Sequence, residues 1–173
     1  MKAIGGEFEI SFKSLNGLSQ LNKRQQINLY SNGRNALKAI LNHISNTKTN
    51  RIHLPYYICG SIVKACIEMK YKVVYYELDE NFLFPLEYLK KIGYNEVLLT
   101  VYYFGIVNDS NTIEQIKKVR EDICCISDNV MSFWTYDKSL ADYSFTSLRK
   151  HFPVPEGGLV YTTDPLFYFN SNF

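Results

Sequence analysis

The stretch DYSFTSLRKHFPVPEGGLVYTT, residues 142–163, decides the expected fold. It begins as an apolar and hydroxyl-rich strand, passes Lys150 and a turn bounded by prolines, and opens a second strand with Gly157 and Gly158. A lysine at a strand end that faces a cleft can be desolvated, which lowers its pKa toward the range of a nucleophilic amine. A solvated surface charge is the ordinary alternative, so the rest of the chain must decide.

Outward from this stretch, segments typical of strands alternate with segments of helical periodicity. Strands are expected where β-branched and aromatic residues run together, and helices where apolar residues recur every three to four positions. The predicted strands are residues 27–30, 51–54, 72–78, 96–103 and 123–127. The predicted helices are residues 36–44, 59–69, 85–92 and 111–120. Asn111 and Glu114 suggest an N-cap and capping-box pair for the last helix.

This alternation predicts right-handed βαβ units and a mostly parallel sheet covered on both faces, a three-layer α/β/α fold. From residue 141 the pattern changes to strand, turn, strand with no long helix between. In such a fold the carboxyl ends of the strands form the working edge. Functional residues are therefore expected where strands pass into loops.

Length and composition restrict the class of protein. The 173 residues suffice for one well-filled core and so predict a single domain, and the 46% hydrophobic and 21% charged residues are typical of soluble proteins. The net charge of +2 with scattered basic residues argues against a nucleic-acid surface. The chain shows neither a signal-peptide run nor an apolar segment of membrane-spanning length, so no membrane association and a cytoplasmic location are expected.

The four cysteines, Cys59, Cys66, Cys124 and Cys125, lack paired metal-ligand spacing. We expect them to be reduced, small and buried, without a disulfide or a metal site.

Three features fall at strand-to-loop junctions. The turn at residues 31–33 leads into a helix N-terminus, where backbone N–H groups and the helix dipole favour a phosphate; plain turn chemistry is the alternative. Asp128 follows an apolar strand, where it could also be a cap or turn residue. Lys150 is the third feature.

One cofactor would explain all three features together. Pyridoxal 5'-phosphate (PLP) needs a lysine that forms an imine, a carboxylate that keeps its ring nitrogen protonated, and an anion site for its phosphate. The chain offers these in the order phosphate turn, carboxylate, lysine.

Several segments resemble, in order, those of the DegT/DnrJ/StrS-type sugar aminotransferases, which are PLP-dependent enzymes with the aspartate-aminotransferase fold. The matching segments are IGGEF (4–8), YSNGRNAL (30–37), LPYYICGSIVKAC (54–66), VYYFGIV (101–107), CISDNVMSFW (125–134) and SFTSLRKHFPVPEGGLVYT (144–162). The resemblance implies that residues 1–173 correspond to the PLP-binding part of the large domain. Relatives continue into a small C-terminal domain, which has no counterpart here.

The resemblance implies roles for particular residues. Lys150 would form the imine with the cofactor, and Asp128 would pair with its pyridine nitrogen. The backbone N–H groups of Gly33 and Arg34 would bind the phosphate.

Two further positions of the cofactor site follow from the resemblance. A serine hydroxyl would contact the phosphate, and either Ser144 or Ser147 could supply it, because one extra residue separates the serine–phenylalanine pair from the lysine. Cys59 stands where many relatives place a ring that stacks on the cofactor, with Tyr56 and Tyr57 nearby as substitutes.

Other positions depart from the family pattern. Met131 stands where many relatives have His or Gln three residues after the aspartate. Relatives that eliminate water have a histidine in place of the lysine, so a shift of one residue would give His151 the role of Lys150. His43 and His53 lack such a context and are expected to be structural.

The resemblance implies transfer of an amino group from an amino-acid donor to a nucleotide-linked keto sugar, in polysaccharide or lipopolysaccharide biosynthesis, by a homodimer. A non-catalytic relative that serves as a binding or assembly module is the alternative. An unrelated nucleotide-binding domain is disfavoured, because no Gly-x-Gly-x-x-Gly sequence follows any predicted strand.

Overall fold

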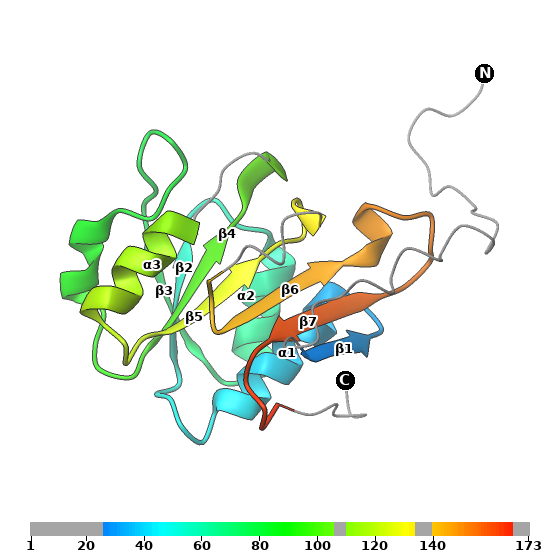
Figure 1. Cartoon of the computed structure of the whole chain (residues 1–173), viewed down its shortest axis with the longest axis horizontal. Coiled ribbons are helices and arrows are strands. Elements are labelled where there is room, and N and C mark those ends of the chain that lie inside the picture. Colours follow the sequence, from blue (N-terminus) through cyan, green and yellow to red (C-terminus); the bar gives the residue numbers. More distant parts are fainter. Residues whose placement is uncertain (1–25, 106–109, 134–139, 168–173) are drawn as a thin grey trace.

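The computed structural model describes residues 26–105, 110–133 and 140–167 (Figure 1). These residues contain a seven-stranded sheet with the strand order β1-β7-β6-β5-β4-β2-β3. The strands are β1 (Gln26–Tyr30), β2 (Arg51–Pro55), β3 (Lys72–Tyr76), β4 (Val97–Val101), β5 (Cys124–Asp128), β6 (Tyr143–Ser147) and β7 (Gly158–Thr162). Neighbouring strands from β6 to β3 run parallel, whereas β7 is antiparallel to both β1 and β6. The predicted mostly parallel sheet is confirmed.

Helices cover both faces of this sheet (Figure 1). The α-helices are α1 (Gly33–Ile44), α2 (Gly60–Glu68) and α3 (Ser110–Val119). Short 3-10 helices are η3 (Leu86–Lys91), η4 (Tyr103–Gly105) and η6 (Leu148–Lys150). Helices α1 and α2 pack on one face, and α3 with η3 packs on the other.

Strand β4 shows why both faces are buried. Its side chains alternate, so that Val97 and Leu99 join the apolar cluster under α1 and α2, while Leu98 joins the cluster under α3. All three side chains are fully buried. A continuous apolar strand predicts burial on two sides, and the three-layer α/β/α prediction is confirmed.

Helix α1 fixes one face of the core. Each buried Leu or Ile side chain contributes about 1.5–3 kcal/mol, and the buried residues of α1 form one stripe: Gly33, Ala36, Leu37, Ala39, Ile40, Leu41 and Ile44. Asn32 caps the helix, because its side-chain oxygen accepts a hydrogen bond from the Asn35 N–H at 3.0 Å. The N-terminus of α1 is therefore held at the carboxyl edge of the sheet.

Some predicted elements differ in detail. In the segment predicted as a helix over residues 85–92, the structure has the 3-10 helix η3 (Leu86–Lys91) instead of an α-helix. None of the residues of η3 is buried, so it lacks the packing that stabilises a longer helix. Helix α3 begins at Ser110, so Asn111 lies inside its first turn instead of capping it, and the preceding position lies outside the described residues. Strand β4 ends at Val101, before a turn in which Phe104 has φ +59°.

The structure corrects one expectation about the cysteines. All four are free, and Cys66, Cys124 and Cys125 are buried as expected, but Cys59 is exposed because it lies in the loop that precedes α2. The described residues hold no group of three or more His, Cys, Asp or Glu side chains that could bind a metal ion. None of the helices in the described part of the chain has the length and apolar character that crossing a membrane requires.

Candidate cofactor site

The carboxyl edge of the sheet gathers most of the predicted site residues. Asp128 is the last residue of β5, and Ser147 is the last residue of β6. Gly33 opens α1, and Cys59 immediately precedes α2. These positions lie in different segments of the sequence, but parallel strands end at the same edge, so the topology places them together.

The turn before α1 is pressed against the ends of β6 and β7. A Cβ atom at Gly33 would lie 3.3 Å from the Cβ of Ser147, and one at Gly158 would lie 2.3 Å from the carbonyl carbon and oxygen of Asn32. The Gly157 N–H donates to the Ser31 carbonyl at 2.7 Å. A side chain at position 158 would therefore force this turn away from the sheet.

Backbone donors gather at the same turn. The side-chain oxygen of Asn32 accepts a hydrogen bond from the Asn35 N–H, and the backbone carbonyl of Asn32 accepts one from the Ala36 N–H at 3.0 Å. The earlier N–H groups of Gly33 and Arg34 have no acceptor within the helix, as at every helix N-terminus. Gly33 is buried and Arg34 is exposed. This arrangement suits an anion that approaches the turn from the solvent.

Asp128 is the buried acid of the site. Its side chain is 6% exposed, and its Oδ1 accepts a hydrogen bond from the Val130 N–H at 2.9 Å. Burial raises the pKa of this carboxyl to about 7, and the single backbone hydrogen bond offsets only part of that effect. A cationic group placed beside Asp128 would favour its ionised form.

The pKa of the Cys59 thiol is influenced by the charges of both Asp128 and Lys150. The Sγ of Cys59 lies 3.2 Å from the Oγ of Ser61, and this hydrogen bond is the main cause that lowers the thiol pKa. The charge of Lys150 lowers the same pKa further, whereas the charge of Asp128 raises it. The charges of Asp128 and Lys150 therefore both influence the thiol at the carboxyl edge.

Lys150 itself differs from the expectation of a desolvated amine. It is the last residue of η6 and it is exposed. Strand β6 ends at Ser147, so the η6 turn carries the lysine beyond the edge of the sheet. No described element covers it there, and the expectation of a dry amine is wrong for this chain.

The two candidate serines, Ser144 and Ser147, lie on opposite faces of the sheet. Asp128 pairs with Phe145 and lies on its face of the sheet, under α1 and α2. Ser147 is two residues from Phe145 and shares that face, whereas Ser144 pairs with Tyr161 on the opposite face. Ser147 is therefore the serine beside Gly33, and Ser144 is buried away from the turn.

The histidines occupy satisfied positions. The His151 ring donates from Nε2 to the Val130 carbonyl at 2.8 Å, so it is bonded to the loop after β5. His43 lies 2.9 Å from an Asp164 oxygen, and buried His53 lies 2.6 Å from a Glu96 oxygen. The structural roles of His43 and His53 agree with the sequence-based expectation.

The loops beside the site present an aromatic cluster that the sequence analysis missed. Tyr57, Phe82 and Phe104 are exposed and pack around buried Tyr103, with ring centroids 5.3–6.1 Å apart. Phe82 and Phe104 have φ values of +62° and +59°, a conformation rare for bulky residues. No short-range pattern predicts such a backbone. Tyr56 is exposed too and stacks on Tyr75 at 5.2 Å.

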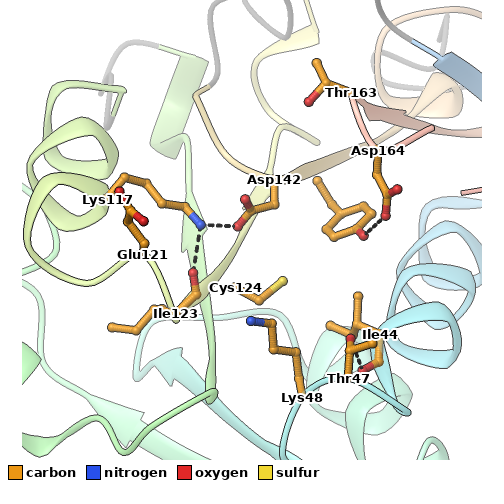
Figure 2. A pocket seen from close by; sticks show the side chains of 11 residues that line it. Ile44, Thr47, Lys48, Lys117, Glu121, Ile123, Cys124, Asp142, Thr163 and Asp164 are labelled. Atoms are coloured by element: carbon orange, nitrogen blue, oxygen red, sulfur yellow. Dashed lines mark hydrogen bonds and ion pairs between the residues drawn. The ribbon is translucent and has the colours of Figure 1, made fainter. Parts of the chain in front are cut away.

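A separate cavity of about 310 Å³ lies at the amino edge of the sheet. Figure 2 shows Lys117 directed toward Asp142 on one wall. On another wall the Tyr143 hydroxyl donates to Asp164. Lys48 donates to the Asp122 carbonyl at 2.8 Å. None of the predicted site residues lines this cavity, so it is distinct from the candidate cofactor site.

Sequence comparisons find neither a matching family profile nor a curated relative, but solved structures match clearly. The chain superimposes on 3-amino-5-hydroxybenzoic acid synthase with a TM-score of 0.68 and 18% identity, over 81% of this chain and 39% of that one. Helicobacter pylori PseC, an aminotransferase of pseudoaminic acid biosynthesis, gives 0.67 and 18%, over 81% and 40%. Escherichia coli GDP-4-keto-6-deoxy-D-mannose-3-dehydratase, solved with bound hydrated PLP, gives 0.67 and 21%, over 82% and 40%.

These neighbours define the class of fold. The chain has the α/β fold that these synthase, aminotransferase and dehydratase structures share over this part of their length, and the resemblance to the DegT/DnrJ/StrS type is confirmed for the fold. The chain spans about two fifths of the length of each of these proteins.

Proposed function

We propose that this chain is the cofactor-binding part of a PLP-dependent sugar aminotransferase. The observation that supports the proposal is the position of three features at the carboxyl edge of the sheet: the glycine-lined turn before α1, buried Asp128 at the end of β5, and Lys150 in the turn that follows β6. These are the anion site, the partner for the ring nitrogen and the imine-forming amine that PLP requires.

The residues present fit the cofactor. A Cβ atom at Gly33 or Gly158 would crowd the turn, so both glycines keep backbone N–H groups close to the sheet edge. Burial holds the Asp128 pKa at about 7 in the unliganded chain, and a cationic ring nitrogen would restore the carboxylate. Ser147 shares the face of Asp128 and can add a hydroxyl to the anion site.

Each residue has a defined task in the proposed reaction. Gly33 and Arg34 would hold the phosphate through their N–H groups, and Asp128 would orient the ring through its nitrogen. The Nζ of Lys150 would hold the cofactor and, when free, would accept and return the proton that moves during amino transfer. PLP supplies the electron sink when bound.

The proposed substrates are an amino-acid donor and a nucleotide-linked keto sugar. Support comes from the neighbours, since one belongs to pseudoaminic acid biosynthesis and another acts on a GDP-linked keto sugar. We also propose a homodimer in the cytoplasm: the exposed aromatic cluster beside the site is a surface suited to burial against a partner. Light scattering of the purified chain tests the dimer, and a monomer at all concentrations would contradict it.

A non-catalytic binding module is the second candidate. It is favoured by the exposure of Lys150, because the described residues do not enclose its amine in a water-excluded pocket. A turnover assay with amino-acid donors separates the two candidates. Cofactor uptake without loss of the donor amino group would support the module.

The proposal is tested by titrating the purified chain with PLP and recording visible absorbance. We expect a saturable band in the wild type, none for Lys150→Ala, and an unchanged band for Lys64→Ala, which removes an exposed lysine of α2. Inorganic phosphate should compete if the turn before α1 binds the phosphate group. A band that does not saturate, or that persists in Lys150→Ala, would contradict the proposal.

A further inference from the structure

Polar side chains join the two residues that flank Asp128. The Oγ of Ser127 donates to the Oδ1 of Asn129 at 2.7 Å, and both side chains are fully buried. Successive side chains alternate across a strand, so this bond lies on the face of the sheet opposite to the Asp128 carboxyl. The bond connects the residues immediately before and after Asp128.

Strand β6 adds a second connection. The Oγ1 of Thr146 donates to the Asn129 carbonyl at 3.0 Å, and the Asn129 N–H donates to the Phe145 carbonyl at 2.8 Å. On the other side of β5, the Tyr102 N–H donates to the Asp128 carbonyl at 3.1 Å. The peptides on either side of Asp128 are thus held from both neighbouring strands.

Packing alone does not account for these polar side chains. Earlier along β5 the same face carries Cys125, which packs in the apolar cluster under α3. Burying a hydroxyl or an amide is unfavourable unless it is hydrogen-bonded. Ser127, Asn129 and Thr146 are each buried and each take part in a side-chain hydrogen bond, while the Nδ2 of Asn129 has no hydrogen-bond partner among the described residues. These directional bonds favour one conformation of the segment.

We propose that Ser127, Asn129 and Thr146 form a clamp that directs the Asp128 carboxyl into the candidate cofactor site. The three are positioning residues, since they act through Asp128. The inference rests on the proposed function for its biological meaning, but the clamp itself can be measured in the cofactor-free chain.

The clamp keeps the Asp128 carboxyl buried. The bond from the Val130 N–H to Asp128 Oδ1 requires one backbone geometry at residues 128–130. A looser segment would let the carboxyl rotate toward solvent, where its pKa returns toward the ordinary value. The titratable groups on which the charge of Asp128 acts are Cys59 and Tyr103, and they are unchanged in the variants below.

Two threonines provide a matched pair for the test. Thr146→Val removes the hydroxyl that bonds to the Asn129 carbonyl. Thr100→Val is the control: Thr100 is buried and pairs with Ser127 in the sheet, but its Oγ1 has no hydrogen-bond partner among the described residues. Both substitutions replace a hydroxyl by a methyl group, and Ser127→Ala provides a second clamp variant should Thr146→Val fail to fold.

The readout is the carbon-13 NMR titration of the Asp128 carboxyl in the cofactor-free chain. The wild type and Thr100→Val should titrate near pH 7, and the clamp variants should titrate lower by about one pH unit or more. Identical titrations in all four proteins would overturn the clamp.

PLP uptake by the same proteins separates this inference from the proposed function. With the clamp and the function both correct, the clamp variants titrate lower and bind PLP more weakly than Thr100→Val. A wild type that binds no PLP would contradict the proposed function, while a lowered titration in the clamp variants would still support the clamp.

Discussion

Charged side chains at the two edges of the sheet differ in whether they pair with other side chains of the protein. At the amino edge charged groups meet partners within the protein: Arg120 binds Asp122 at 2.8 Å, and Glu96 binds both His53 and Arg51. At the carboxyl edge Asp128 is buried with one backbone donor, and Lys150 is exposed. Charged side chains that pair with each other stabilise the fold, whereas ionisable side chains without a partner of opposite charge among the described residues are candidates for binding a ligand.

The largest expected effect is a pH dependence from Asp128. Its folded-state pKa is raised from 3.8 to about 7, so the folded chain keeps a proton that the unfolded chain releases. This contribution to stability is lost as pH rises from about 4 to about 7, and a three-unit rise corresponds to about 4 kcal/mol. Asp128→Asn cannot ionise, so it should be more stable than the wild type at pH 7.5 and lose this advantage toward pH 4.

Urea unfolding of both proteins at a series of pH values measures this difference. The same variant should bind PLP more weakly, because the ring nitrogen loses its anionic partner. A wild type and an Asp128→Asn protein with parallel pH profiles would show that the carboxyl is not buried in solution.

Removing a paired carboxylate at the amino edge should lower the stability of the fold without changing the candidate cofactor site. Glu96→Ala removes the carboxylate that lies 2.6 Å from buried His53 and accepts the Gly93 N–H at 2.9 Å. The loss should be about 1–3 kcal/mol: burial lowers the pKa of His53, so the neutral ring would keep a buried N–H without its acceptor. PLP affinity of the folded fraction should stay the same.

The control for this variant is Glu68→Ala. Glu68 pairs with Lys38 at the surface, so its removal should cost less than about 1 kcal/mol. Equal losses in urea unfolding for the two variants would remove the distinction between the buried and the exposed pair.

Gly158→Ala should affect both stability and ligand binding. The added Cβ would lie 2.3 Å from the Asn32 carbonyl, so the turn before α1 must shift. We expect a loss of about 2 kcal/mol and a weaker phosphate-dependent affinity for PLP. Gly60→Ala is the matched control, since a Cβ at Gly60 meets nothing within 4 Å and should change stability by less than about 1 kcal/mol. Equal behaviour of the two variants in calorimetry and PLP titration would contradict the close approach.

The smallest effect on stability is expected for Cys59→Ala, within about 0.5 kcal/mol, because the thiol is exposed. Its reactivity is more informative. A thiol reagent should modify Cys59 before the three buried cysteines, since its pKa is lowered by Ser61 and by Lys150. Bound PLP should slow this modification; an unchanged rate would place Cys59 outside the site.

Much of the fold follows from local patterns. The alternation of apolar strands and amphipathic helices gave the layers and the parallel core of the sheet, and Asp128 and Gly33 lie at strand-to-loop junctions as expected. The choice between Ser144 and Ser147 was also within reach, because Phe145 is an apolar core residue and only Ser147 shares its side of a strand.

Other features depend on contacts between distant segments. The need for Gly158 arises from Asn32, which is far away in the sequence, and the left-handed backbone of Phe82 and Phe104 has no local signature. The exposure of Lys150 follows from where β6 ends. The polar neighbours of Asp128 were visible in the sequence, but their hydrogen bonds required the structure.

The most direct test of the shared site is to locate PLP on the chain after reduction with borohydride and peptide mass mapping. If Asp128 and the turn before α1 hold the cofactor beside Lys150, the label should reside on Lys150 in the wild type and fall sharply in Asp128→Asn. A label spread over exposed lysines such as Lys64, and insensitive to position 128, would contradict the central claim.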